Sequence, residues 1–142
     1  MRVLFRVGNV GLSLPGDAVA GMYEVDRREL LQAGEEQPCG CVGLLDLASP
    51  VEVFDISSVL RIDRGFECSI TVLVLDDAAG GWWGIMADRV EKIVAVSEAE
   101  TWPVPLLWQL FQPVPFDRIE GFSGAMYASC DAARLSVLVR GM

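Results

Sequence analysis

Two apolar runs separated by a charged pair dominate the middle of the chain. Residues 85–87 and 90–96 are rich in β-branched side chains, and Asp88 and Arg89 stand between them. Side chains of that kind fit a pleated, largely buried surface better than a helix. The pattern predicts two consecutive strands with a kink at the charged pair.

Two adjacent tryptophans, Trp82 and Trp83, come just before these runs. Neighbouring side chains on a strand point to opposite faces, so both cannot enter the same core. We expect one of them to face outward. An outward tryptophan is typical of a contact surface for another protein. The alternative is that it lies over a loop of its own domain.

Alternation of apolar and polar positions predicts short strands along most of the chain. Val3, Phe5 and Val7 form one such row, and Gly8 with Asn9 supplies the turn of a hairpin that continues into residues 11–14. The run at 68–75 is apolar throughout, as in a strand buried on both faces. Further strands are expected at 18–25, at two segments within 42–56 broken at 48–50, at 119–130 and at 134–139.

Helical signals are short. Residues 26–33 predict one or two turns capped by Asp26, and Asp55 is placed to cap a helical piece near Leu60. Pro-Val-Pro occurs at 103–105 and at 113–115 and brackets a helical stretch. We expect that stretch, 106–112, to plug the open end of a barrel, and a mimic of a partner helix is the less favoured alternative.

About ten short strands with frequent turn signals predict a mainly β protein, either a closed barrel or a sandwich. A chain of 142 residues has the length of one domain. The hydrophobic fraction of 52% is high, but no apolar stretch reaches transmembrane length. The first residues alternate like a strand and lack the order of a secretory signal. We therefore expect a cytoplasmic protein without direct membrane insertion.

The net charge of −9 argues against binding to a nucleic-acid backbone, and the sequence contains no local basic patch. Basic protein surfaces are the more plausible partners. The chain has no histidine, which removes Ser-His-Asp and Cys-His catalysis and the commonest metal ligand. Lys92 is the only lysine and is expected to point to water.

The four cysteines do not predict a metal or redox site. Cys39 and Cys41 are separated by one residue, which does not match the two-residue spacing of structural zinc or redox motifs. Mostly buried thiols are the simpler interpretation for these two and for Cys68 and Cys130. We expect no metal and no cofactor.

Several segments in order resemble the CheW family, the adaptor proteins of bacterial chemotaxis-type signalling. The most specific match is the segment Gly-Ile-Met-Ala-Asp-Arg-Val at 84–90, which is similar to the Gly-Ile-Val-Asp-x-Val segment of the family. Other matching segments lie at 5–8, 12–15, 51–56, 102–105 and 119–121. The resemblance covers nearly the whole chain.

The resemblance implies one CheW-like domain over residues 1–142, built from two small five-stranded β-barrels that share a hydrophobic core. It also implies no enzymatic activity and no cofactor. The implied partners are a CheA-type histidine kinase and the cytoplasmic tip of a chemoreceptor or a similar helical hairpin. The implied function is an adaptor that couples the two in chemosensory signal transduction.

The chain departs from the family at both contact regions. Leu47 and Ala48, after Asp46, stand where the family carries an Arg-Gly pair implicated in receptor contact. Gly21 replaces an acidic residue associated with kinase contact, Glu52 replaces a proline, and the helix that often follows the last strand is expected to be missing. By position, the resemblance assigns the kinase side to Val19, Gly21 and Gly43, and we assign the receptor side to Leu47, Ala48, Trp82 and Trp83.

Two other functions remain open from the sequence. A small barrel of this apolar composition could bind a small apolar ligand. Hydrolysis by carboxylates at Asp46, Asp55 or Asp88 is less favoured, because each stands where a turn would use it as a cap.

Overall fold

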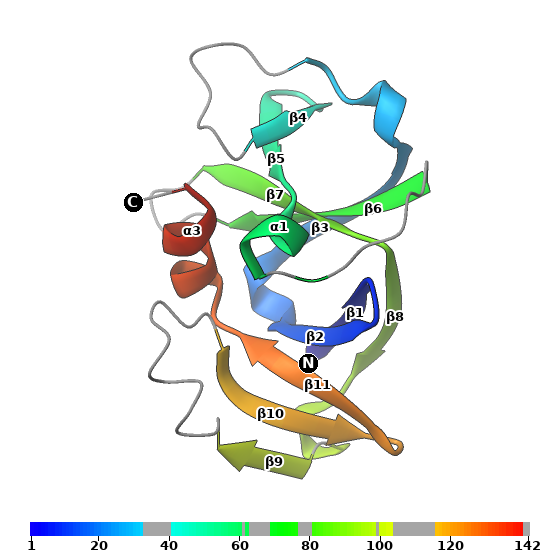
Figure 1. The fold of residues 1–142 in the computed structure, drawn as a ribbon, viewed down its shortest axis with the longest axis vertical. Coiled ribbons are helices and arrows are strands. Elements are labelled where there is room, and N and C mark those ends of the chain that lie inside the picture. Colours follow the sequence, from blue (N-terminus) through cyan, green and yellow to red (C-terminus); the bar gives the residue numbers. More distant parts are fainter. Residues whose placement is uncertain are drawn as a thin grey trace.

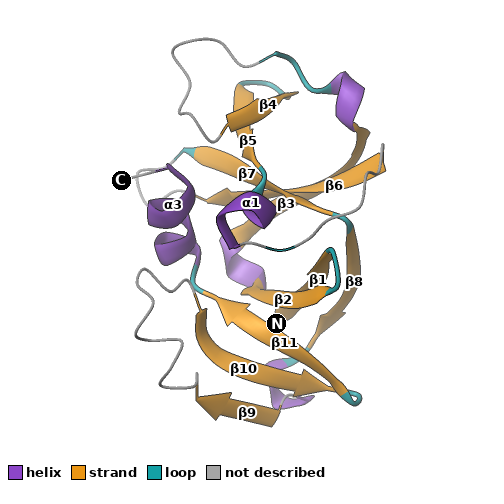
Figure 2. Cartoon of the chain, in the orientation of Figure 1, coloured by secondary structure: helices purple, strands orange, loops and turns teal. Residues whose placement is uncertain are grey.

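The fold comes from a computed structural model that describes residues 1–32, 41–60, 62, 69–76, 81–98, 100–103 and 116–140. Strands dominate it, and they form two sheets stacked along the long axis of the molecule (Figure 1). The mainly β class predicted from the sequence is therefore confirmed. Figure 2 shows that the few helical segments lie at the ends of strands and between the sheets.

The first sheet has six strands in the order β8-β1-β2-β11-β10-β9. Hairpin turns at Gly8 (φ 59°) and at Ser123 and Gly124 (φ 49° and 82°) connect β1 to β2 and β10 to β11, where left-handed backbone conformations fit tight turns. The strands are β1 (Arg2–Val7), β2 (Val10–Pro15), β8 (Arg89–Val94), β9 (Glu100–Pro103), β10 (Phe116–Phe122) and β11 (Ala125–Cys130).

The second sheet has five strands in the order β3-β6-β7-β5-β4. The predicted break near residues 48–50 and the predicted kink after residue 87 are both confirmed. Strand β6 lies inside the sheet, and six of its eight residues are buried, as its unbroken apolar run indicated. The strands are β3 (Val19–Asp26), β4 (Cys41–Asp46), β5 (Pro50–Phe54), β6 (Ser69–Asp76) and β7 (Trp82–Ala87).

Both sheets are rolled. Val94 of β8 packs against a buried cluster that includes Phe122 of β10, although three strands separate β8 from β10 in the sheet order. In the second sheet, an isolated bridge between Leu31 and Leu44 links the segment after β3 to the opposite edge strand, β4. The strand pairing of the described residues nevertheless leaves both sheets open, so the expectation of two closed five-stranded barrels is not confirmed.

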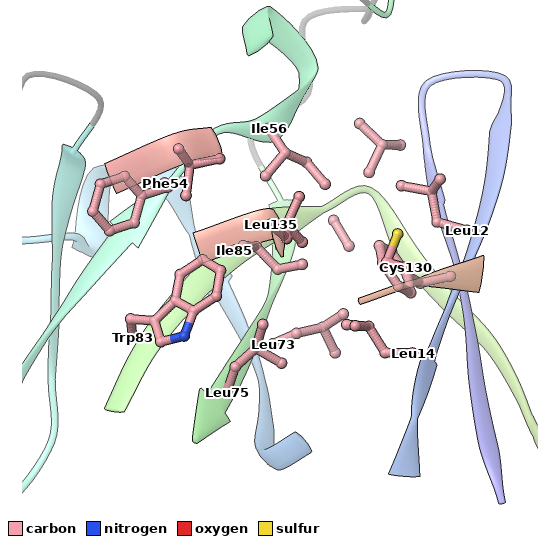
Figure 3. Packing of buried hydrophobic residues seen from close by; sticks show 14 residues of the cluster. Leu12, Leu14, Phe54, Ile56, Leu73, Leu75, Trp83, Ile85, Cys130 and Leu135 are labelled. Atoms are coloured by element: carbon pink, nitrogen blue, oxygen red, sulfur yellow. The ribbon is translucent and has the colours of Figure 1, made fainter. Parts of the chain in front are cut away.

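One hydrophobic cluster draws side chains from both sheets. Figure 3 shows Leu12 and Leu14 of the first sheet pointing toward the space that Phe54 and Trp83 of the second sheet also enter. The α1 helix (Ile56–Leu60) and the α3 helix (Ala132–Arg140) add buried residues to the same cluster, among them Leu135. This core lies between the two sheets, so it fixes how their outer surfaces are placed.

The C-terminal segment corrects the sequence prediction. Residues 134–139 were expected to be a strand but belong to α3, and the helix expected to be missing after the last strand is therefore present. Leu135 and Val139 are buried while Val137 is 50% exposed, which is the spacing of a helix and not of a strand. Oδ1 of Asp131 accepts hydrogen bonds from the backbone N–H groups of residues 133 and 134, so it caps the helix.

Two shorter corrections concern turns and helices. The single strand expected at 119–130 is a hairpin, because the Ser123–Gly124 turn divides it. Near residue 26 the helix is one 3-10 turn, η2 (Arg27–Glu29), capped by Asp26 as predicted. The predicted 106–112 helix, Cys39 and Cys68 lie outside the described residues.

Candidate protein-binding surfaces

All seven residues assigned to partner binding lie on the second sheet or on one of its turns. The structure divides them into three places: the start of β3, the middle of β4, and the end of the sheet where β4 meets β5 and where β7 begins. Val19 and Gly21 are on β3, Gly43 is on β4, Leu47 and Ala48 follow β4, and Trp82 and Trp83 open β7.

At β3, the space above Gly21 is taken by an aromatic ring. A Cβ atom at position 21 would lie 2.9 Å from a ring carbon of Tyr23 and 3.1 Å from its hydroxyl oxygen. Residues two apart on a strand share a face, so this contact follows directly from the strand geometry. Tyr23 is 38% exposed and Met22 is 42% exposed on the other face of the strand. The exposed surface of β3 therefore combines Met22 and Tyr23 with the carboxylate of Glu24.

Gly43 is buried beneath the chain that follows η2. A Cβ atom there would lie 2.9 Å from Cβ of Leu30 and 3.1 Å from the carbonyl oxygen of Leu31. The same segment forms the bridge between Leu31 and Leu44, with two backbone hydrogen bonds of 2.8 Å. The absence of a side chain at Gly43 thus permits the close approach that joins the two edges of the rolled sheet.

The two tryptophans face opposite ways, as predicted. Trp83 is 1% exposed and packs edge to face against Phe54, with ring centroids 6.1 Å apart. Trp82 is 52% exposed, and its indole Nε1–H donates a 3.1 Å hydrogen bond to Oδ1 of Asp76 on the neighbouring strand. Of the two, only Trp82 leaves its ring exposed to solvent, whereas Trp83 belongs to the core between the sheets.

Leu47 and Ala48 lie at the same end of the sheet as Trp82. Strands β5 and β7 are parallel and pair Val53 with Gly84, so continuing the register toward their starts places Val51 beside Trp82. The turn that holds Leu47 and Ala48 comes immediately before β5. Ala48 is exposed, and Leu47 packs partly against the buried cluster of the second sheet.

Sequence reasoning missed several exposed apolar residues. Met22 and Tyr23 stand on β3, while Trp102 on β9 and Met126 on β11 are 44% and 63% exposed on the first sheet. Each sits within an alternating or apolar run, and alternation does not identify which face a second layer will cover. For Trp102, the one available indication was the glycine at position 121. Gly121 on β10 has no side chain, and the Trp102 ring rests against it.

The carboxylates considered for catalysis are engaged in local structure. Oδ1 of Asp55 accepts hydrogen bonds from the backbone N–H and the hydroxyl of Ser57 at the start of α1. A carboxylate oxygen of Asp88 accepts a hydrogen bond from the backbone N–H of Gly8. Asp46 is exposed and pairs with Pro50 at the end of β4. Asp55 and Asp88 thus have the structural use expected for turn residues.

The described part of the chain gives little support for a reactive thiol or a metal site. Burial raises the pKa of the Cys130 thiol well above its usual range, and nearby Asp117 and Asp131 act in the same direction. Cys41 is partly buried. The described residues contain no group of three or more His, Cys, Asp or Glu side chains placed to hold a metal ion. Lys92 is exposed, as predicted.

One pocket of about 240 Å³ lies where β3 and β6 approach the junction of β7 and β8. Its lining mixes apolar and charged side chains: Met22, Glu24, Ser69, Ile70, Thr71, Asp88, Arg89 and Val90. No helix in the described residues is long and apolar enough to span a bilayer.

The architecture and surfaces define a small, mainly β protein with two rolled sheets, a shared core and exposed apolar patches. No protein-family model and no curated protein match the sequence. Among solved structures, the chain is similar to the scaffolding protein TtCheW from Thermoanaerobacter tengcongensis, with a TM-score of 0.71 and 18% sequence identity. The match covers 94% of this chain and 90% of that chain. The chain therefore has a CheW-like fold, as the resemblance of its segments predicted.

Proposed function

We propose that the chain is a non-catalytic adaptor that couples a chemoreceptor-like protein to a CheA-type histidine kinase in bacterial chemosensory signalling. The observation that carries the proposal is the likeness to TtCheW, a scaffolding protein, over nearly the full length of both chains. Residues 1–142 then act as one domain in the cytoplasm. The absence of histidine from the sequence and the use of Asp55 and Asp88 in local structure agree with a role without catalysis.

On the kinase side, the proposal rests on the surface of β3. Val19 and Gly21 are partly buried, and the exposed side chains beside them are Met22 and Tyr23. A partner that docks here meets an aromatic ring, a thioether and the exposed carboxylate of Glu24 on the same strand. Gly43 is itself buried against Leu30, so its part in this proposal is indirect.

On the receptor side, the proposal rests on Leu47, Ala48 and Trp82. Trp82 supplies the large exposed aromatic side chain that commonly anchors protein interfaces. Trp83 contributes indirectly by fixing the start of β7 in the core.

Binding to purified partners tests this function. A CheA-type kinase regulatory domain and a receptor cytoplasmic hairpin are titrated separately and together, and isothermal calorimetry records each affinity. We expect micromolar or tighter binding to both and a ternary complex on a sizing column. A folded chain, verified by circular dichroism, that binds neither partner would refute the adaptor role.

Within the described residues, the interior of the second sheet gives no support to the alternative of a small apolar ligand. Val53, Val72 and Met86 are fully buried in the cluster of the second sheet. The pocket near β3 carries Glu24, Asp88 and Arg89, which do not suit an apolar molecule. Native mass spectrometry of freshly purified protein tests this alternative, since a stoichiometric bound compound would favour it.

A further inference from the structure

Basic residues are absent from a continuous part of the second sheet. The sequence contains no lysine or arginine between Arg28 and Arg61 or between Arg64 and Arg89. Strands β4, β5, β6 and β7 fall within these two intervals. They carry only acidic charges, and a surface of one sign attracts a partner of the opposite sign.

An acidic charge lies with apolar side chains at one end of these strands. Asp76 ends β6 and pairs directly with Trp82 at the start of β7, and both are exposed. Leu47 and Ala48 follow Asp46 at the turn into β5. We call these four residues, Leu47, Ala48, Asp76 and Trp82, the Trp82 surface.

The hydrogen bond between Trp82 and Asp76 orients this surface. The 3.1 Å bond from the indole Nε1–H to Oδ1 of Asp76 fixes the plane of a ring that is half exposed. The face of an indole ring attracts a lysine or arginine side chain, and a carboxylate at its edge strengthens that attraction. A ring held in place loses less conformational entropy on binding than a free one.

We propose that the Trp82 surface binds a basic amphipathic helix of a partner protein. A lysine or arginine of the helix lies over the indole of Trp82 beside Asp76, and an apolar side chain next to it packs on Leu47 and Ala48. The inference rests on the proposed adaptor function and identifies the chemistry of the receptor-side partner.

A second copy of the chain fits this surface poorly. Each copy carries a net charge of −9, and the surface itself would meet carboxylates in a symmetric pairing of two such patches. A basic helix meets no such repulsion. Charge complementarity therefore selects a basic protein segment as the occupant.

Two matched synthetic helices test the inference without a kinase. The first carries leucine and arginine on one face, and the second replaces each arginine by glutamate. The ¹⁵N-labelled chain is titrated with each peptide, and the Trp82 indole N–H signal and the amides of residues 46–48 are followed by NMR. We expect these signals to move with the arginine peptide, to move less at high salt and to stay in place with the glutamate peptide.

Point variants assign the contact to the Trp82 surface. Asp76→Asn keeps an acceptor for the indole N–H but removes the charge, and Trp82→Leu removes the ring. We expect each to weaken binding of the arginine peptide by about fivefold to tenfold, a loss of roughly 1 kcal/mol. Asp117→Asn, which removes an exposed charge from the first sheet, serves as the control and should leave the affinity unchanged.

Several outcomes would overturn the inference. Equal binding of both peptides, or signal changes confined to the first sheet, would show that the Trp82 surface does not select a basic helix. Concentration-dependent signal changes at the Trp82 surface without peptide would instead identify a second copy as the occupant. Failure of the proposed adaptor function would give a different result. The chain would then bind neither the kinase nor the receptor in the calorimetric titrations, while its response to the arginine peptide stayed unchanged.

Discussion

The hydroxyl of Ser13 donates a 2.6 Å hydrogen bond to Oε1 of Glu120, a residue 107 positions away. Glu120 is fully buried, and its other carboxylate oxygen lies 3.3 Å from Nε of Arg2 and 3.5 Å from Nε of Arg118. One buried carboxylate thereby links β1, β2 and β10. The first strand of the chain is tied in this way to the strands near its end, on the inner face of the first sheet.

Loss of the Glu120 carboxylate should destabilise the protein strongly. Glu120→Ala leaves the buried guanidinium of Arg2 without its partner, and breaking a buried ion pair in that way costs about 3–5 kcal/mol. Urea unfolding followed by circular dichroism measures the change. Glu100→Ala, at an exposed position of β9, is the control and should shift the free energy of unfolding by less than about 0.5 kcal/mol. Equal losses for both variants would contradict a stabilising role for the buried cluster.

The buried contacts of Glu120 with Arg2 and Ser13 illustrate what the sequence could not predict. Alternation placed strands at both ends of the chain, but it gave no sign that Arg2 and Glu120 point to the same interior. A buried charge is recognised only through its partners, and these come from distant parts of the chain. The prediction that one of the two adjacent tryptophans faces outward was correct, because adjacent residues on a strand must face opposite ways.

The misassigned C-terminal helix has a different cause. In residues 134–139, apolar residues at every second position mimic a strand, while the same residues also satisfy helical spacing. A short apolar segment does not distinguish the two periods by itself. The decisive signal was the Asp131 cap, which the sequence contains and which the periodicity argument did not weigh. The burial of Gly43 was likewise not visible in the sequence, since only the fold brings Leu30 against it.

The paired tryptophans should respond oppositely to substitution. Trp83→Ala removes a buried ring that packs against Phe54 and should cost about 3–5 kcal/mol of the free energy of unfolding. Trp82→Ala removes a half-exposed ring and should cost less than about 1 kcal/mol. Guanidinium unfolding monitored by circular dichroism compares the two, because both substitutions alter the fluorescence. A larger loss for Trp82→Ala would contradict the assignment of Trp83 to the core.

Gly21 and Tyr23 should be energetically coupled. Gly21→Ala places a methyl group where the Tyr23 ring lies and forces the ring to move, which offsets the gain from a less flexible chain. In a Tyr23→Ala background the same change should be stabilising. A double-mutant cycle measured by thermal unfolding should give a coupling of about 1 kcal/mol. Additive effects of the two substitutions would mean that the ring does not occupy the space above Gly21.

Acid titration should reveal the contact between Asp26 and Arg28. Hydrogen bonds from the guanidinium and the backbone N–H of Arg28 lower the pKa of the Asp26 carboxyl from 3.8 to about 2. Because the folded state binds this proton less readily, the stabilisation is present above the ordinary pKa and is lost as the pH falls toward 2. The carboxyl carbon signal in a ¹³C NMR titration should have its midpoint near that value. Arg28→Gln should raise the midpoint toward the ordinary pKa, whereas Arg27→Gln, the neighbouring control, should leave it in place, and an unshifted midpoint in the Arg28 variant would refute the assignment.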